Sequence, residues 1–407
     1  MITTKNKLKD RIEELFALAP DRNGGANRPA FSKAEAEAML LVAGWARAAG
    51  LEPAVDPFGN LWCLPPGDGP FVTSGSHVDT VPDGGRLDGS LGTVIAVEAA
   101  ERVAGQRGIL VCAAEEAARF GAGTLGSRSM TGNLSDTDLA RMRDAEGRGA
   151  LSVRSEYLNA LERIPKLERA PLERVLAHVE VHIEQRADLR KHGLSLGIAT
   201  TIAGPVRHHL RFIGEVAHAG ETPAAERRDA LCAAAEIVLL AEKLCQQYAP
   251  HTTATVGTLL IHPNSLTSIP GAAELGVDIR SVEPGGAKRL LDELLHGARR
   301  AAGSRGVTLA DVPLSVSEPT VMDEAMVRAA ESACGRLEVR CGRCVSFAGH
   351  DAQHIARTVP AALLFVASEN GVSHAPGEAA DWKDVEAALA VLVELMHSLQ
   401  GGGNDGR

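Results

Sequence analysis

The sequence predicts an α/β protein: a mostly parallel sheet with helices on both faces, plus an inserted, smaller α+β domain of ferredoxin-like order. Three observations support this fold class. Short apolar strands alternate with amphipathic helices at both ends of the chain, a pattern typical of parallel sheets. A middle segment shows the β-α-β-β-α-β order of a split ferredoxin-like unit. The length of 407 residues also exceeds what one ordinary core accommodates.

The outer parts of the chain, 1–206 and 317–407, are predicted to form the larger domain. Ser32 and Glu35 have the spacing of a capping box at the start of a helix. The glycine-rich tail is expected to be disordered. The expected strands are 61–65, 70–77, 108–116, 175–185 and 361–368, and the expected helices are 5–18, 32–50, 89–103 and 384–399.

The middle part, 207–316, is predicted to be a second domain inserted into the first. Its pattern changes from buried apolar strands to long alternating strands separated by two amphipathic helices. The expected elements are a strand over 206–220, a helix over 229–249, strands over 253–263 and 271–282, a helix over 286–302 and a strand over 306–316. A loop would not contain a complete β-α-β-β-α-β series, so a separate domain is expected.

Charge and composition argue against several classes of partner. The formal net charge is −10, whereas a nucleic-acid or anionic-membrane surface requires a basic face. The N-terminal stretch becomes charged at once and lacks the apolar core of a signal peptide, so a cytoplasmic location is expected. Seven irregularly spaced cysteines do not indicate a disulfide framework. The pair Cys341 and Cys344 is a lone CxxC, which is more often incidental than a redox or metal site.

Histidines and acids recur where the predicted strands of the larger domain end. In open α/β sheets, ligands bind beyond the carboxyl ends of the strands, so residues distant in sequence can converge there. One further acid stands at the start of a predicted helix. The candidates are His77, Asp88, Glu115, Glu116, His182 and His374.

These residue types suit a dinuclear metal site. Three imidazoles with Asp88 and Glu116 provide more ligands than one tetrahedral catalytic zinc uses. Shared between two ions, with Asp88 as a bridge, they leave open positions for a water and a substrate oxygen. Asp79 is placed to accept the second ring N–H of His77 and fix its tautomer. Glu115 should point away from Glu116 on the strand end, which makes it the natural general base.

Each candidate also has a simpler interpretation when taken alone. A histidine on a strand is usually packed or at the surface, and His178 lies on the same face as His182 without need of a function. A pair of glutamates is usually solvated. The recurrence of such residues at several strand ends favours a common site.

Several motifs, in order, resemble those of the hydantoinase/carbamoylase amidases. This family includes N-carbamoyl-L-amino-acid hydrolases, β-ureidopropionases and allantoate amidohydrolases, within the dinuclear-zinc aminoacylase and carboxypeptidase superfamily. The similarity covers nearly the whole chain, and its fold would be that of a zinc exopeptidase with a lid domain. The matching motifs are GSHVDTVPDGGRLDGSLG, EEAARFGAGTLGSRSMTG, HIEQ, AHAGETPAAERRDA, PNSLTSIPG with VDIR, and GHDA with SENGVSHAPGE.

The resemblance implies roles for individual residues. Two divalent ions, zinc first and otherwise manganese, cobalt or nickel, would be held by His77, Asp88 and His182 and by Asp88, Glu116 and His374. Glu115 would be the general base. His218 would polarise the scissile carbonyl, in the partner subunit's site if the inserted domain forms a homodimer. Gln185 and Arg280 would contact a small-molecule substrate, Arg280 by binding its carboxylate.

The chain departs from the family pattern at positions that face the substrate. Arg186 and Ala117 replace glycines, Ala217 replaces an asparagine before His218, and Thr267 stands where an asparagine assists Arg280. Hydrolysis of the carbamoyl C–N bond of an N-carbamoyl-L-amino acid or similar ureido acid is therefore expected from the ligands and the base. A deacylase or dipeptidase remains an alternative because of Arg186 and Thr267. A non-catalytic dimer that binds a small acid is the third.

Overall fold

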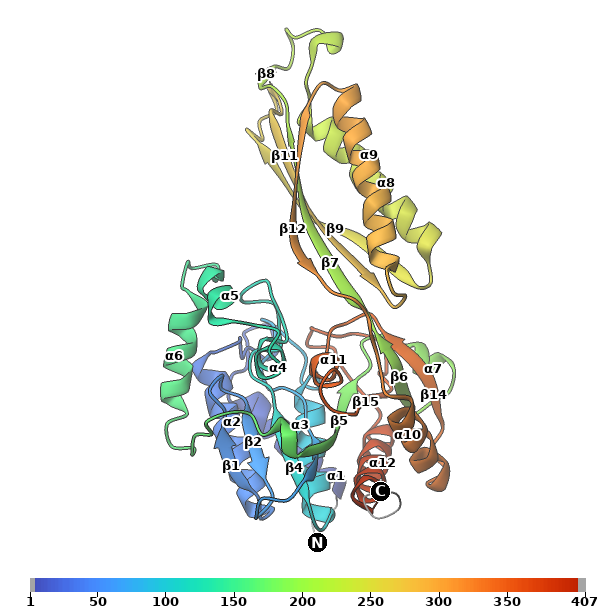
Figure 1. Cartoon of the computed structure of the whole chain (residues 1–407). Coiled ribbons are helices and arrows are strands. Elements are labelled where there is room, and N and C mark those ends of the chain that lie inside the picture. The colour runs from blue at the N-terminus through green and yellow to red at the C-terminus, as the bar shows by residue number, and fades with distance from the viewer. Residues whose placement is uncertain (1–3, 402–407) are drawn as a thin grey trace. The chain divides into compact units, whose positions relative to one another are not determined.

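The computed structural model describes residues 4–401, so the tail 402–407 lies outside the described residues. The chain forms two compact units (Figure 1). The first unit contains the residues up to 200, 321–344 and those from 348 onward, and the second unit contains 201–320 and 345–347. Within the described residues, no helix is long and apolar enough to cross a membrane.

A nine-stranded mixed sheet organises the first unit. Its strands follow the order β1-β2-β4-β3-β5-β15-β6-β13, and β14 pairs with β6. The four neighbouring strands β4, β3, β5 and β15 are parallel, whereas β1, β2 and β6 pair antiparallel with their neighbours. The strands are β1 Glu52–Val55, β2 Leu61–Leu64, β3 Phe71–Ser74, β4 Arg107–Val111, β5 Val175–Ile183, β6 Leu196–Ile202, β13 Thr320–Val321, β14 Cys341–Ser346 and β15 Ala361–Val366.

Helices cover both faces of the central strands. All residues of β15 and residues 177–183 of β5 are buried, whichever face of the sheet their side chains point to. Helix α3 packs on β4 and β5, α12 packs on β3, β5 and β15, and α11 packs on β5 and β15. The helices are α1 Thr4–Ala17, α2 Lys33–Ala48, α3 Ser90–Arg102, α4 Leu125–Met130, α5 Asp136–Arg141, α6 Ala150–Ala160, α7 Asp188–Lys191, α10 Glu324–Arg336, α11 Asp351–Ile355 and α12 Trp382–Gly401, with a 3-10 turn at Leu172–Arg174.

Helix α3 approaches β5 closely at Gly92. A methyl group at this position would overlap the Val181 carbonyl oxygen of β5. Overpacking of this kind costs roughly 1–3 kcal/mol, so Gly92→Ala should lower the free energy of unfolding by about that amount in a urea titration. Gly44→Ala is the matched control on α2, because no described heavy atom lies within 4 Å of the added methyl. It should raise stability by about 0.5–1 kcal/mol, and equal losses in both variants would contradict the close approach.

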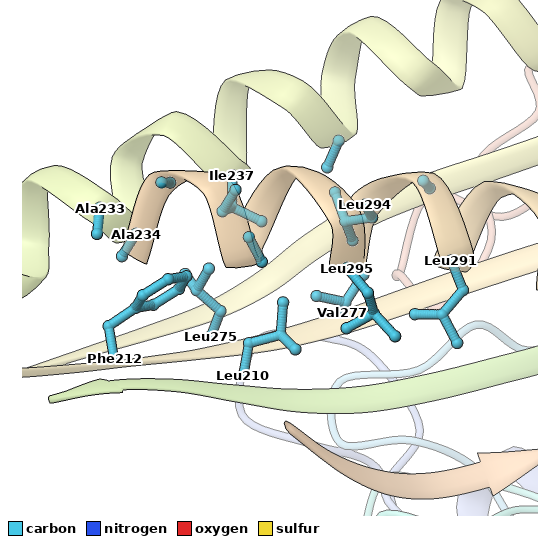
Figure 2. Close-up of a cluster of buried hydrophobic side chains, with 14 of the residues drawn as sticks. Leu210, Phe212, Ala233, Ala234, Ile237, Leu275, Val277, Leu291, Leu294 and Leu295 are labelled. Carbon is cyan, nitrogen blue, oxygen red and sulfur yellow. The ribbon is translucent and has the colours of Figure 1, made fainter. Parts of the chain in front are cut away.

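The second unit has the predicted β-α-β-β-α-β order. Its four-stranded antiparallel sheet follows the order β12-β7-β11-β9, and α8 and α9 lie side by side along one face (Figure 1). Phe212 of β7 and Val277 of β11 point toward Ile237 and Leu294 of these helices (Figure 2). The elements are β7 Gly204–Ile213, β8 Ala217–His218, α8 Ala230–Tyr248, β9 Thr252–His262, β10 Ser268–Ile269, β11 Ala272–Ser281, α9 Gly286–Ser304 and β12 Thr308–Val316, with a 3-10 turn at Ala224–Glu226.

Two local expectations differ from the structure. Parallel pairing is confined to the centre of the large sheet, since the flanking strands reverse direction. Only half of the expected capping box forms: Ser32 Oγ accepts the Glu35 backbone N–H at 3.1 Å. The Glu35 side chain instead accepts the N–H groups of Phe31 and Ala114, because it is fully buried beside a loop that offers free backbone donors.

Candidate metal centre and active site

The first donor set combines His77, Asp88 and His182. His77 follows β3 and forms a parallel bridge with Cys112, His182 is the penultimate residue of β5, and Asp88 precedes α3. Asp88 Oδ1 lies 3.4 Å from His77 Nε2 and 3.2 Å from His182 Nε2. All three side chains are buried, and their donor atoms lie within 4.8 Å of one another. The parallel strands β3 and β5 end at the same edge of the sheet, which is why these residues meet.

The second donor set shares Asp88 and adds Glu116 and His374. The other Asp88 oxygen, Oδ2, lies 3.4 Å from His374 Nε2, and Glu116 Oε1 lies 3.5 Å from the same nitrogen. His374 stands in the loop after β15 with a left-handed φ of 56°. Glu116 follows β4, so four parallel strands contribute to the two sets.

Asp88 is placed as a bridge, because each carboxylate oxygen faces one donor set. Gln185 Nε2 also donates to Asp88 Oδ2 at 3.0 Å. Burial opposes ionisation of Asp88, but the charge and hydrogen bonds of His182, His374 and His77 outweigh it and hold the pKa of this carboxyl well below its usual range. Imidazoles and carboxylates at these spacings, with one carboxylate in common, fit two divalent transition-metal ions.

Asp79 connects the first donor set to the loop after β4. Its two carboxylate oxygens accept the backbone N–H groups of Glu115 at 3.0 Å and Glu116 at 2.9 Å. His77 Nδ1 lies 3.1 Å from the Asp79 backbone oxygen and 3.4 Å from its Oδ1. The expected contact with the His77 ring is therefore shared with the main chain, since the carboxylate also holds the glutamate loop.

Glu115 lies at the edge of the first donor set. Its Oε2 is 3.8 Å from His77 Nε2, and the side chain is 11% exposed. Burial raises the pKa of the Glu115 carboxyl well above its usual range. A glutamate that is adjacent to the donor atoms and has a raised pKa is suited to accept a proton from water and return it.

Sequence reasoning missed Glu35 as part of this site. Glu35 Oε1 accepts the N–H of Ala114 at 2.8 Å, so Glu35 and Asp79 together hold three consecutive backbone amides of the loop that carries Glu115. Ala114 has a left-handed φ of 55°. The spacing of Ser32 and Glu35 predicted only a helix cap and gave no sign of this role. The sign appears in the structure, where Glu35 is fully buried at the start of its helix.

His218 lies in the second unit, and its hydrogen bonds indicate which ring nitrogen carries the proton. It belongs to the short strand β8, which pairs with β10, and its side chain is exposed. Its Nδ1 accepts the N–H groups of Gly220 at 3.1 Å and Glu221 at 3.2 Å. In a neutral imidazole the other nitrogen then carries the proton, so His218 presents Nε2–H as a donor.

Arg280 is held firmly on β11. Its Nε donates to Asp278 Oδ1 at 2.8 Å and its Nη1 to the Phe347 backbone oxygen at 2.8 Å. Arg207 Nε binds the other oxygen of Asp278 at 2.7 Å. These bonds do not use all the guanidinium N–H groups of Arg280, so donors remain for a carboxylate.

The structure does not bring Thr267 and Arg280 together within one chain. The Ala219 N–H binds the Thr267 carbonyl at 3.0 Å, which places Thr267 beside His218. The two-stranded sheet of β8 and β10 lies beyond the Ala272 end of β11, whereas Arg280 stands eight residues along the same strand. Eight residues of extended chain span roughly 26 Å, which is longer than a small ureido acid.

Among the described residues, neither donor set includes the other expected residues. Arg186 is exposed and its Nε pairs with Asp188 Oδ2 at 2.9 Å. His178 is buried, and its Nδ1 lies 3.0 Å from Thr73 Oγ1. Burial lowers the pKa of His178 to about 3, which agrees with the simpler interpretation of a packed histidine. Cys341 and Cys344 lie three residues apart on β14, so their side chains point to opposite faces of the strand.

The family model of peptidase family M20/M25/M40 matches residues 74–398. The chain belongs to this M20 family. It is 32% identical over 403 residues to the N-carbamoyl-L-amino-acid amidohydrolase of Pseudomonas sp. (strain NS671), covering 96% of this chain and 97% of that relative. It is 31% identical over 412 residues to the allantoate amidohydrolase of Bacillus subtilis (strain 168), covering 98% of both.

A solved structure places this M20-family chain in one branch. The crystal structure of an amidase of the hydantoinase/carbamoylase family from Burkholderia vietnamiensis matches with a TM-score of 0.86 and 30% identity over 97% of both chains. The expected resemblance to hydantoinase/carbamoylase amidases is thereby confirmed. The M20-family protein is a hydrolase that acts on amide C–N bonds.

Proposed function

We propose that the protein hydrolyses the carbamoyl C–N bond of an N-carbamoyl-L-amino acid or a similar small ureido acid. The observation that carries this proposal is the sharing of Asp88 between two donor sets, with Glu115 at their edge. The names of the relatives support a ureido substrate, since they include an N-carbamoyl-L-amino-acid amidohydrolase and an allantoate amidohydrolase. Cleavage of this bond would release the amino acid and carbamic acid, and the carbamic acid would break down to ammonia and carbon dioxide.

Glu115 acts as general base and then as general acid in the proposed reaction. Two divalent ions bound by the donor sets would acidify the attacking water and stabilise charge on the ureido oxygen. Glu115 accepts a proton from water as the water oxygen attacks the ureido carbon. The same carboxyl then returns the proton to the leaving nitrogen as the C–N bond breaks. His218 donates its Nε2–H to the oxyanion that develops on the ureido oxygen.

The protein is proposed to act as a homodimer through the second unit, with His218 of one subunit working at the site of its partner. The separation of Thr267 and His218 from Arg280 along one sheet supports this arrangement. One small substrate cannot reach both ends of β11 in a single chain, so an active site that uses both must take them from two chains. A two-fold dimer supplies them symmetrically.

A substrate panel tests the proposed reaction. Purified protein supplied with Zn²⁺, Mn²⁺, Co²⁺ or Ni²⁺ is incubated with N-carbamoyl-L-amino acids, allantoate, N-acetyl-L-amino acids and dipeptides, and released ammonia and amine are measured separately. We expect ammonia and amine together from a ureido substrate. The D-enantiomers and a chelator-treated sample are the controls.

Other outcomes of the panel would contradict the proposal. Amine released without ammonia, from N-acetyl amino acids or dipeptides alone, would assign a deacylase or dipeptidase instead. Two bound metal ions with no turnover of any compound would indicate the non-catalytic acid-binding dimer.

A further inference from the structure

Glu378 joins the backbone on which Asp88 stands to the loop after β15. The side chain is 7% exposed. Its Oε2 accepts the N–H of Leu87 at 2.6 Å and the N–H of Asp88 at 2.9 Å. One carboxylate oxygen therefore fixes the main chain of Asp88 itself, from a residue 290 positions away in sequence.

The second oxygen of Glu378 reaches the loop that carries His374. Glu378 Oε1 lies 3.4 Å from Ser373 Oγ, and Ser373 Oγ lies 3.0 Å from Asp88 Oδ2. Ser373 directly precedes His374. The Glu378 carboxylate thus contacts two of the three segments that supply the second donor set, that of Asp88 by backbone amides and that of His374 through a hydroxyl.

Gly85 shows how tightly the two segments meet. A methyl group at Gly85 would overlap the Oε2, Cδ and Cβ atoms of Glu378. The second glycine of the GGR sequence is thus required where the chain passes over this side chain. A shift of Glu378 would release the loop that precedes Asp88.

We propose that Glu378 is a positioning residue that fixes the geometry of the second donor set by holding Asp88 and the His374 loop together. This inference rests on the proposed dinuclear site. Glu378 acts through the backbone of Asp88 and the hydroxyl of Ser373. Partners that orient metal ligands typically contribute 10- to 100-fold to metal affinity or activity.

Cobalt binding tests the inference without relying on turnover. Co²⁺ is titrated into metal-free full-length protein, and the visible absorption spectrum and the affinity for each ion, measured against a competing chelator, are recorded. Glu378→Ala should weaken binding of the second Co²⁺ by roughly 10- to 100-fold and change the absorption bands. Glu378→Gln should recover most of the affinity, because its amide oxygen can still accept the two backbone N–H groups.

Glu184→Ala is the matched control. Glu184 is also 7% exposed; its Oε1 accepts the backbone N–H groups of Asp188 and Leu189 at the start of α7, and its Oε2 accepts that of Ser368 at 3.4 Å, but none of its described bonds reaches Asp88 or Ser373. It should keep the wild-type cobalt spectrum. Gly85→Ala provides a second approach if Glu378→Ala does not fold, because the added methyl should displace the carboxylate and produce the same spectral change.

The outcomes separate this inference from the proposed function. Wild-type protein that binds fewer than two Co²⁺ ions would overturn the dinuclear site. If the wild type binds two ions but Glu378→Ala and Gly85→Ala both keep its affinity and spectrum, only the positioning role of Glu378 is overturned. An equal loss of affinity in Glu184→Ala would also overturn it, since the effect would then reflect a general loss of buried hydrogen bonds.

Discussion

Replacing Glu115 with glutamine should lower kcat by about two to four orders of magnitude, the contribution expected of a general base. The amide cannot accept the proton of the attacking water, yet it has nearly the same size and shape. Glu115 is outside the two donor sets, and its backbone N–H is held by Asp79. The variant should therefore retain its bound metal and its fold, as measured by metal analysis and circular dichroism beside steady-state kinetics.

An exposed glutamate provides the control for this substitution. Glu162→Gln changes the same functional group on the surface of the first unit and should leave kcat and metal content unchanged. Wild-type kcat in Glu115→Gln would show that another group accepts the proton. Loss of metal with loss of activity would instead make Glu115 a ligand.

Replacing His218 with alanine should lower kcat by about 10²- to 10³-fold, the effect of removing one donor to a developing oxyanion. The two donor sets belong to the first unit and His218 to the second, so metal content should not change. His192→Ala, an exposed histidine of the first unit, is the control. Unchanged kcat in His218→Ala would exclude the proposed contact with the ureido oxygen.

Mixed dimers decide which subunit supplies His218. A dimer of one Glu115→Gln subunit and one His218→Ala subunit contains one complete site only if the histidine acts across the interface. Random mixing of equal amounts should then restore up to about a quarter of the wild-type rate, since half of the dimers are mixed and each has one intact site. No recovery, with mixed dimers verified by mass, would place His218 and Glu115 of the same subunit at one site.

The sequence by itself determined the fold class and most of the donor set. Apolar periodicity predicted five of the nine strands of the large sheet, namely β2, β3, β4, β5 and β15, and parallel strands necessarily end at one edge. Residues at the ends of those strands, such as His77, Glu116 and His182, were therefore predictable as neighbours from the sequence. The motif resemblance added the pairing of these residues into two sets that share Asp88.

Only the tertiary structure decided what holds the donor residues in place. Glu35 and Glu378 lie far in sequence from the amides that they bind, and a bond from a carboxylate to a backbone N–H leaves no side-chain pattern at the partner position. The distance between Thr267 and Arg280 likewise follows from the folded strand, because β11 runs extended from Ala272 to Arg280 and keeps its two ends apart. The sequence alone predicted the candidate donor groups because strand ends are local features, whereas the support of these groups depends on contacts that exist only after the chain has folded.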